Sequence, residues 1–438
     1  MHQSTTLATH HADLVTDVAY DYYGERLATA SGDQKIKVWK KDPVKGSWDL
    51  EDEWKAHDAP VLQLAWSHPE HSNLLASCSY DRSVRIWEEV TVPHGAGGGA
   101  AGRPGGMPTA MTTTGTQQTM SMNTTPGKRW IECGLLMDAR GSVRNLEFAP
   151  NAFGLKLATI STDSYLRIYA CLSPSLDDWQ LTNTVSLPSL QSSHNAKSAT
   201  SDDTPHATGG VGAGLSLTGS ASQSSVNAPN PGKGNEALGG WCLSWCKERW
   251  WGQVLAATSG HSGIIKLITL STSTPSALLV LHPPPTPSTS VTSNGTPNSS
   301  TAAQGLGSQA ITSLSWAPAC GRSYHLIASG HRDGTVRVWK VVPPAASAED
   351  GEQQRVKGQQ QQSVWRGEVV AEWGKGDVTV GKVEWNMTGS ILSVASEDGK
   401  VRLFKATYAG DWQLYGTFSA EAPVDEAQDG DDGGRMQE

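Results

Sequence analysis

Six similar segments, each with an apolar strand, a strand of small residues and an alternating strand with an aromatic end, predict an all-β fold: a β-propeller of six four-stranded blades. The last two strands stand together, for example in LATASGDQKIKVW (27–39), LLASCSYDRSVRIW (74–87) and LIASGHRDGTVRVW (326–339). Without the low-complexity stretches between the segments, about 280 residues remain for six units, near the ~40–45 residues of one blade. We therefore expect one propeller over residues 11–419.

Each strand of a unit has its own pattern. The first is a short apolar run, as in VTDVAY, VLQLAW and VGKVEW. The second consists of Ala, Ser and Thr, whose small side chains let neighbouring sheets approach closely. In the third, apolar residues such as Ile36 and Val38 alternate with Lys or Arg, which is the period of a half-buried strand. The fourth is expected in WDLEDEW, WIECGLLM, WQLTNTVSL and WQLYGTF, with SALLVL and VWRGEVVAEW in the fourth and fifth units.

An aspartate stands in the turn between the second and third strands of five units. These residues are Asp33, Asp81, Asp163, Asp333 and Asp398. A carboxylate at this position can accept bonds from backbone N–H groups of the turn and from a neighbouring histidine, so we assign the five a structural role. The fourth unit has His261 here instead, and we expect its blade to be the least regular.

Low-complexity stretches separate or follow the units. They are residues 91–127, 188–239, 282–309, 342–362 and the acidic tail 420–438. Their apolar content is too low to offset the entropy lost on ordering, so we expect long disordered loop insertions and a disordered tail.

Composition excludes several classes of function. Lys and Arg number 34 against 43 Asp and Glu, a formal charge of −9, whereas nucleic-acid binding normally rests on a basic surface. The same balance argues against adhesion to an anionic membrane. The sequence has no run of about 20 apolar residues that would span a bilayer, and its N-terminus lacks the pattern of a secretory signal. Six scattered cysteines are typical of a reducing compartment, so we expect a cytosolic or nuclear protein.

Some residue patterns resemble catalytic or metal-binding sites, and we expect them to serve packing instead. Cys242 and Cys246 are four apart, about 13 Å along a strand, too far to share a zinc ion at ~2.3 Å per bond. We expect no catalytic, metal-binding or cofactor-binding residues. An enzyme that uses the central channel is the rival of a different class, but the sequence offers no convergent cluster of carboxylates or histidines for it. Trp250 and Trp251, beside Arg249, are either a surface anchor for a partner or buried at a blade corner.

The repeat resembles the WD-repeat family, with Trp39, Trp87 and Trp339 at the closing aromatic position and a His-Asp opening at His57. HADLVTDVAYDYYGERLATASGDQKIKVW is similar to the opening shared by Seh-type nucleoporins and their paralogues, the Sec-thirteen coat propellers. Three further segments favour the Seh type. They are FAPNAFGLKLATISTDSYLRIY, WAPACGRSYHLIASGHRDGTVRVW and WNMTGSILSVASEDGKVRLFKATYAGDWQLYGTF.

This resemblance implies a scaffold subunit of the Y-shaped complex in the outer ring of the nuclear pore, at the nuclear envelope, supporting transport of protein and mRNA. It implies protein partners, chiefly an α-solenoid nucleoporin that donates strands as an extra blade. It also implies membership of the SEA/GATOR complex, which regulates TOR signalling at the vacuolar or lysosomal membrane. Neither direct nucleic-acid binding nor a transmembrane segment is expected. A propeller of the Sec-thirteen type in the COPII vesicle coat is the alternative.

An open ring is also expected from the residues themselves. The sixth unit has its own fourth strand at 412–418, so an N-terminal strand in residues 1–10, at Thr5, Thr6, Leu7 and Ala8, finds no vacancy there. We expect this strand beside a gap between the first and sixth blades, where a partner enters by β-augmentation. The alternative is that residues 1–8 are frayed and the six blades close on themselves.

Overall fold

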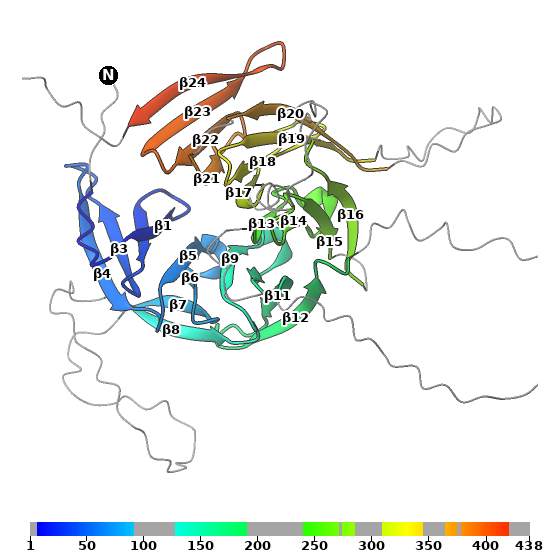
Figure 1. Ribbon diagram of the computed structural model, residues 1–438. Coiled ribbons are helices and arrows are strands. Elements are labelled where there is room, and N and C mark those ends of the chain that lie inside the picture. The colour runs from blue at the N-terminus through cyan, green and yellow to red at the C-terminus, as the bar shows by residue number, and fades with distance from the viewer. Residues whose placement is uncertain are drawn as a thin grey trace, which may run out of the picture.

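The computed structural model describes residues 7–91, 128–190, 240–270, 274–284, 309–344, 364–374 and 378–419 and confirms six four-stranded antiparallel blades around one axis (Figure 1). We number the blades 1 to 6 along the chain. Blade 1 consists of Val15–Tyr20 (β1), Arg26–Ser31 (β2), Lys35–Lys41 (β3) and Trp48–Lys55 (β4). No helix of the described residues has the length and apolar character needed to cross a membrane.

The other blades repeat this plan, and each uses four consecutive strands. Blade 2 has Val61–Trp66 (β5), Leu74–Ser79 (β6), Val84–Thr91 (β7) and Lys128–Leu136 (β8). Blade 3 has Val143–Phe148 (β9), Lys156–Ser161 (β10), Tyr165–Cys171 (β11) and Trp179–Ser186 (β12). Blade 4 has Cys242–Trp245 (β13), Val254–Thr258 (β14), Ile265–Thr269 (β15) and Ser276–Leu281 (β16).

Blade 5 has Ile311–Trp316 (β17), His325–His331 (β18), Val336–Val342 (β19) and Arg366–Trp373 (β20). Blade 6 has Val380–Trp385 (β21), Ile391–Ser396 (β22), Lys400–Ala406 (β23) and Trp412–Ser419 (β24). Short 3-10 helices, Pro69–His71 (η1), Asn151–Phe153 (η2) and Arg249–Trp251 (η5), lie between the first two strands of blades 2, 3 and 4. Blade 4, which lacks the turn aspartate, has the shortest strands, with four to six residues each.

The hydrophobic core lies between blades rather than within them. Five clusters of buried side chains fill the junctions 1–2, 2–3, 3–4, 4–5 and 5–6. Alternation in the third strand produces this arrangement: Ile36 and Val38 of β3 point to blade 2 and are fully buried there. The described residues form no sixth cluster between blades 6 and 1, the two ends of the ring.

The expected N-terminal strand is wrong for its described part. Leu7 and Ala8 are not in a strand, and β1 begins only at Val15; Thr5 and Thr6 lie outside the described residues, as do most of the predicted insertions and the tail. The backbone instead runs to the turn of blade 1, where the Ala12 N–H donates to Asp33 Oδ2 (3.0 Å). Each described sheet consists of the four strands of its own unit, and Leu7 and Ala8 belong to none of them.

Candidate protein-interaction site

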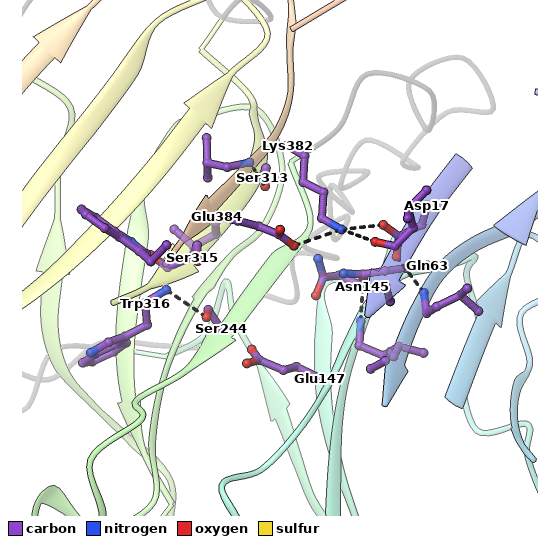
Figure 2. Close-up of a pocket in the computed structure, with 18 of the residues that line it drawn as sticks. Asp17, Gln63, Asn145, Glu147, Ser244, Ser313, Ser315, Trp316, Lys382 and Glu384 are labelled. Carbon is purple, nitrogen blue, oxygen red and sulfur yellow. Dashed lines mark hydrogen bonds and ion pairs between the residues drawn. The ribbon is translucent and has the colours of Figure 1, made fainter. Parts of the chain in front are cut away.

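At each of the five junctions between blades that follow one another in the chain, called the regular junctions, the same kind of hydrogen bond joins the inner strands near the axis. A backbone N–H of one inner strand donates to a side-chain oxygen on the inner strand of the preceding blade, as Leu64 N–H does to Asp17 Oδ2 (2.9 Å). The acceptors at the next four junctions are Gln63, Glu147, Ser244 and Ser313, for the N–H groups of Leu146, Trp245, Trp316 and Val383. Figure 2 shows these side chains around the axial cavity. The bonds hold successive inner strands in register.

The junction of blades 6 and 1 is built differently, because β21 presents a lysine toward β1. Lys382 Nζ donates to Asp17 Oδ1 (2.8 Å) and to the Val18 carbonyl (3.0 Å), and it lies 3.1 Å from Glu384 Oε1 (Figure 2). Burial lowers the pKa of Lys382, but the charges of Asp17 and Glu384 outweigh it, and the pKa is raised. At this junction the ion pair of Lys382 and Asp17 therefore replaces the hydrogen bond between a backbone N–H and a side-chain oxygen that joins the inner strands elsewhere.

Farther from the axis, the outward face of blade 6 is uncovered. Val401 and Leu403 of β23 correspond to Val336 and Val338 of β19, which are at most 4% exposed under blade 6. Val401 and Leu403 are instead half-buried, as is Ala395 of the small-residue strand β22. The sequence pattern of a covered blade is therefore present on blade 6, but among the described residues no blade covers it.

Two glycines at one position of the fourth strand show the same contrast. Gly134 pairs with Ile86 in blade 2, and a Cβ added to it would lie 2.9 Å from the Trp179 ring of blade 3. Gly416 pairs with Leu403 in blade 6, and a Cβ there would meet nothing within 4 Å. The fourth strand of blade 6 therefore lacks the close neighbour that blade 3 provides for blade 2.

Exposed apolar side chains gather at the two ends of the ring. In the part of the chain that the structure describes, twenty-two large hydrophobic residues are exposed; eight lie in or beside blade 1 and six in or beside blade 6. On the side of blade 1 that faces blade 6, Leu27 and Trp39 are buried, but Val18 is 39% and Tyr20 60% exposed. On blade 6, Phe418 is 37% exposed. We define the opening as the space between these two faces, and an apolar surface of this kind marks a protein-interaction site.

Two of the predicted turn aspartates bind a histidine. His11 Nδ1 lies 2.9 Å from Asp33 Oδ2, and His57 Nδ1 lies 2.9 Å from Asp81 Oδ2. Burial raises the pKa of both carboxyls, but the hydrogen bonds from histidine and from backbone N–H groups lower it by more, so both pKa values lie below the ordinary value. The second histidine nitrogen reaches a strand hydroxyl that also accepts the indole N–H of Trp39 or Trp87.

Arginine replaces histidine in two other blades. Arg167 donates to Asp163 (2.7 Å) and Arg402 to Asp398 (2.5 Å), both across four residues. Asp333 accepts the Thr335 N–H (2.9 Å), while His331 of the same blade bonds to Ser329. All five aspartates also accept a backbone N–H two residues on, in one turn geometry. They lie at separate blades and do not form one site.

The axis contains a cavity of about 740 Å³ lined by the inner strands of all six blades. Within the described ranges, no group of three or more His, Cys, Asp or Glu side chains is placed to hold a metal ion. Cys242 and Cys246 are buried in the core between blades 4 and 5, and burial raises the pKa of Cys242 to about 12 and that of Cys246 to about 11. Both thiols are thus inert packing groups.

The two tryptophans differ in exposure, and the hypothesis of a partner anchor stays a prediction for Trp250 alone. Trp250 is 74% exposed, with the Arg249 guanidinium 4.4 Å from its ring centre, whereas Trp251 packs against His325 and Trp365.

Sequence reasoning missed the Asp17–Lys382 pair. Its only signal was a lysine in the inner strand VGKVEW, where the other units have Asp, Gln, Asn, Cys or Ser.

Comparison with known proteins adds a family context. The model of the WD domain, G-beta repeat, matches residues 2–40, 48–88 and 302–340, and that of the anaphase-promoting complex subunit 4 WD40 domain matches 344–411. The chain is 30% identical over 436 residues to nucleoporin SEH1 of Saccharomyces cerevisiae, covering 94% of this chain and 98% of the relative. Identity to nucleoporin seh1 of Schizosaccharomyces pombe is 28% over 424 residues, covering 95% and 97%. For nucleoporin SEH1 of Homo sapiens it is 26% over 419 residues, covering 95% and 88%.

Proposed function

Because the chain belongs to the SEH1 family of nucleoporins, we propose that it is a non-enzymatic scaffold subunit of the nuclear pore complex at the nuclear envelope. We place it in the Y-shaped complex of the outer ring, where it supports transport of protein and mRNA. Relatives named nucleoporin SEH1 in yeasts and human support the assignment. The COPII coat role of the Sec-thirteen type stays the alternative, and the names of these relatives favour the nuclear pore.

The opening carries the mechanism that we propose. An α-solenoid nucleoporin places strands between blades 6 and 1 as an extra blade and covers Val401, Leu403 and Ala395 on one side. On the other side it contacts Val18 and Tyr20, which are exposed in the chain alone. The gain comes from burying two apolar faces and from backbone hydrogen bonds along the inserted strands. In this proposal Thr5, Thr6, Leu7 and Ala8 contact the guest.

We further propose that the chain is a subunit of the SEA/GATOR complex, which regulates TOR signalling at the vacuolar or lysosomal membrane. The same opening receives the partner there. In this proposal both partners use the same two faces, so the two memberships are mutually exclusive for a single molecule. The chain then reaches either membrane only through its partners.

Co-expression with the α-solenoid nucleoporin of the Y-shaped complex tests the proposal. We expect one peak of the two proteins on size exclusion. Leu403→Glu should abolish co-elution, because it places a charge on the face that the guest must cover. Leu181→Glu is the matched control: Leu181 is 41% exposed on the outer strand of blade 3, away from the opening, and should change nothing.

Affinity capture of the wild-type chain separates the alternatives. Nucleoporins and SEA/GATOR subunits are the expected partners, and a return of COPII cage subunits would contradict the assignment. Co-elution that survives Leu403→Glu would show that the partner binds elsewhere on the propeller.

A further inference from the structure

The axial end of the opening is closed by a single ion pair. Asp17 is 6% exposed and uses both carboxylate oxygens: Oδ2 accepts the Leu64 N–H of blade 2, and Oδ1 accepts Lys382 Nζ of blade 6. Lys382 also bonds to the Val18 carbonyl of β1. Lys382 therefore ties the inner strand of the last blade to the inner strand of the first.

This tie competes with a guest blade for the same space. At the five regular junctions, the inner strands of successive blades lie directly against each other: β1 against β5, β5 against β9, β9 against β13, β13 against β17 and β17 against β21. A guest that packs as a blade must place its own inner strand between β21 and β1. Lys382 and Asp17, whose charged groups are 2.8 Å apart, cannot keep their bond once a strand lies between them.

We propose that the Asp17–Lys382 pair is a latch that holds the empty ring together at the axis and that the guest strand must displace. This inference rests on the proposed function, because it presupposes that a partner enters the opening. Once displaced from Asp17, the lysine keeps Glu384 (3.1 Å) as a partner. A side-chain oxygen on the guest's inner strand would give it a second acceptor, just as Asp17, Gln63 and Ser313 accept N–H groups of neighbouring blades. The occupant to which this points is a β-strand donor with an oxygen-bearing side chain at this register.

A covalent tie across the latch gives the decisive test. In a Cys320→Ser background, which removes the exposed cysteine, Asp17→Cys and Lys382→Cys are joined by a short bis-maleimide. The control is the same variant treated with N-ethylmaleimide, which blocks both thiols without bridging them. The probe is the recombinant α-solenoid nucleoporin, followed by biolayer interferometry. We expect the control to bind and the bridged chain to associate at least about 100-fold more slowly.

Each outcome has a distinct meaning. If the bridged chain associates at the rate of the control, the latch is wrong while the proposed function stands. If wild type and control both fail to bind, the proposed function fails, and the latch with it.

A milder variant tests the electrostatic part. Lys382→Met keeps most of the side-chain volume and removes the charge, and we expect association about five-fold faster than wild type. Raising NaCl from about 0.05 M to about 0.5 M should accelerate wild type and not this variant, because salt screens the pair. Lys55→Met, which breaks the exposed pair of Lys55 and Asp58 on blade 1, is the control and should behave as wild type. Equal rates for Lys382→Met and wild type at low salt would overturn the latch.

Discussion

The loss of unfolding free energy on truncating Leu403 to alanine tests whether the outward face of blade 6 is uncovered in the chain alone. Its counterpart Val338 is fully buried against blade 6, so Val338→Ala should lower the free energy of unfolding by about 2 kcal/mol. A covered leucine at position 403 would cost about 3–5 kcal/mol on truncation. Because Leu403 is half-buried, its pairing neighbour is Gly416 and the space beyond is open, we expect a loss below about 1 kcal/mol in the chain alone.

The same substitution should be felt in the complex. A guest blade that covers Leu403 removes its remaining exposed surface, so Leu403→Ala should weaken binding by about 1–2 kcal/mol, or about 5- to 30-fold in Kd. Urea unfolding measures the first quantity, and titration calorimetry with the α-solenoid nucleoporin measures the second. A loss near 3 kcal/mol in the free chain would refute the reasoning, because the face would then be covered without a partner. An unchanged Kd would mean that the partner does not use this face.

Three further predictions concern groups whose surroundings are fixed by the blades. Burial lowers the pKa of His325 to about 4, below the ~6.5 of an unfolded histidine, so this group should make the free energy of unfolding fall by about 1.4 kcal/mol per pH unit as the pH drops from ~6.5 to ~5. His325→Phe should make this pH dependence shallower in thermal unfolding. An unaltered pH dependence would contradict the assignment. Asp81 accepts hydrogen bonds from His57, the Ser83 hydroxyl and backbone N–H groups, so Asp81→Asn should lower the free energy of unfolding by about 1–3 kcal/mol in urea. Asp333→Asn should lower it clearly less, because the bond from the Thr335 N–H is the one described for Asp333 above. Equal losses would argue against a contribution of the histidine bond. Gly134→Ala should destabilise the free chain by about 1–3 kcal/mol and Gly416→Ala by less than about 0.5 kcal/mol, a contrast that vanishes if the ring is closed.

The blades could be predicted because their signals are local. Alternation in KIKVW and VRVW is complete within five residues, and the turn aspartates sit at a fixed distance from it. The strand positions and the burial of Ile36 and Val38 follow from this pattern alone. For the arginines of the third strand, the sequence pattern predicted only that they alternate with apolar residues. Arg167 and Arg402 instead turn back to the aspartate four residues earlier, a role that depends on the absence of a histidine in those blades.

The position of the opening, between the first and sixth blades, could be predicted from the sequence, but the residue contacts across it could not. Lys382 and Asp17 are 365 residues apart, and their meeting depends on the summed rotation of six blades, which no local pattern encodes. The N-terminal strand was predicted from a few apolar and β-branched residues. A strand needs a partner edge, and the segment was tied to Asp33 through His11 and Ala12 instead, so Leu7 and Ala8 stay outside every ladder.

The absence of a shared strand explains how the ring can open without loss of the fold. Each described sheet consists of four consecutive strands, so no backbone ladder joins the two ends of the chain. The junction of blades 6 and 1 rests on Lys382, which is 37% exposed, and a pair of that exposure contributes about 1 kcal/mol or less. Each of the other five junctions buries ten or more side chains. Separating the ends therefore costs far less than separating any other two neighbours, and a guest that buries both faces gains more than the latch contributes.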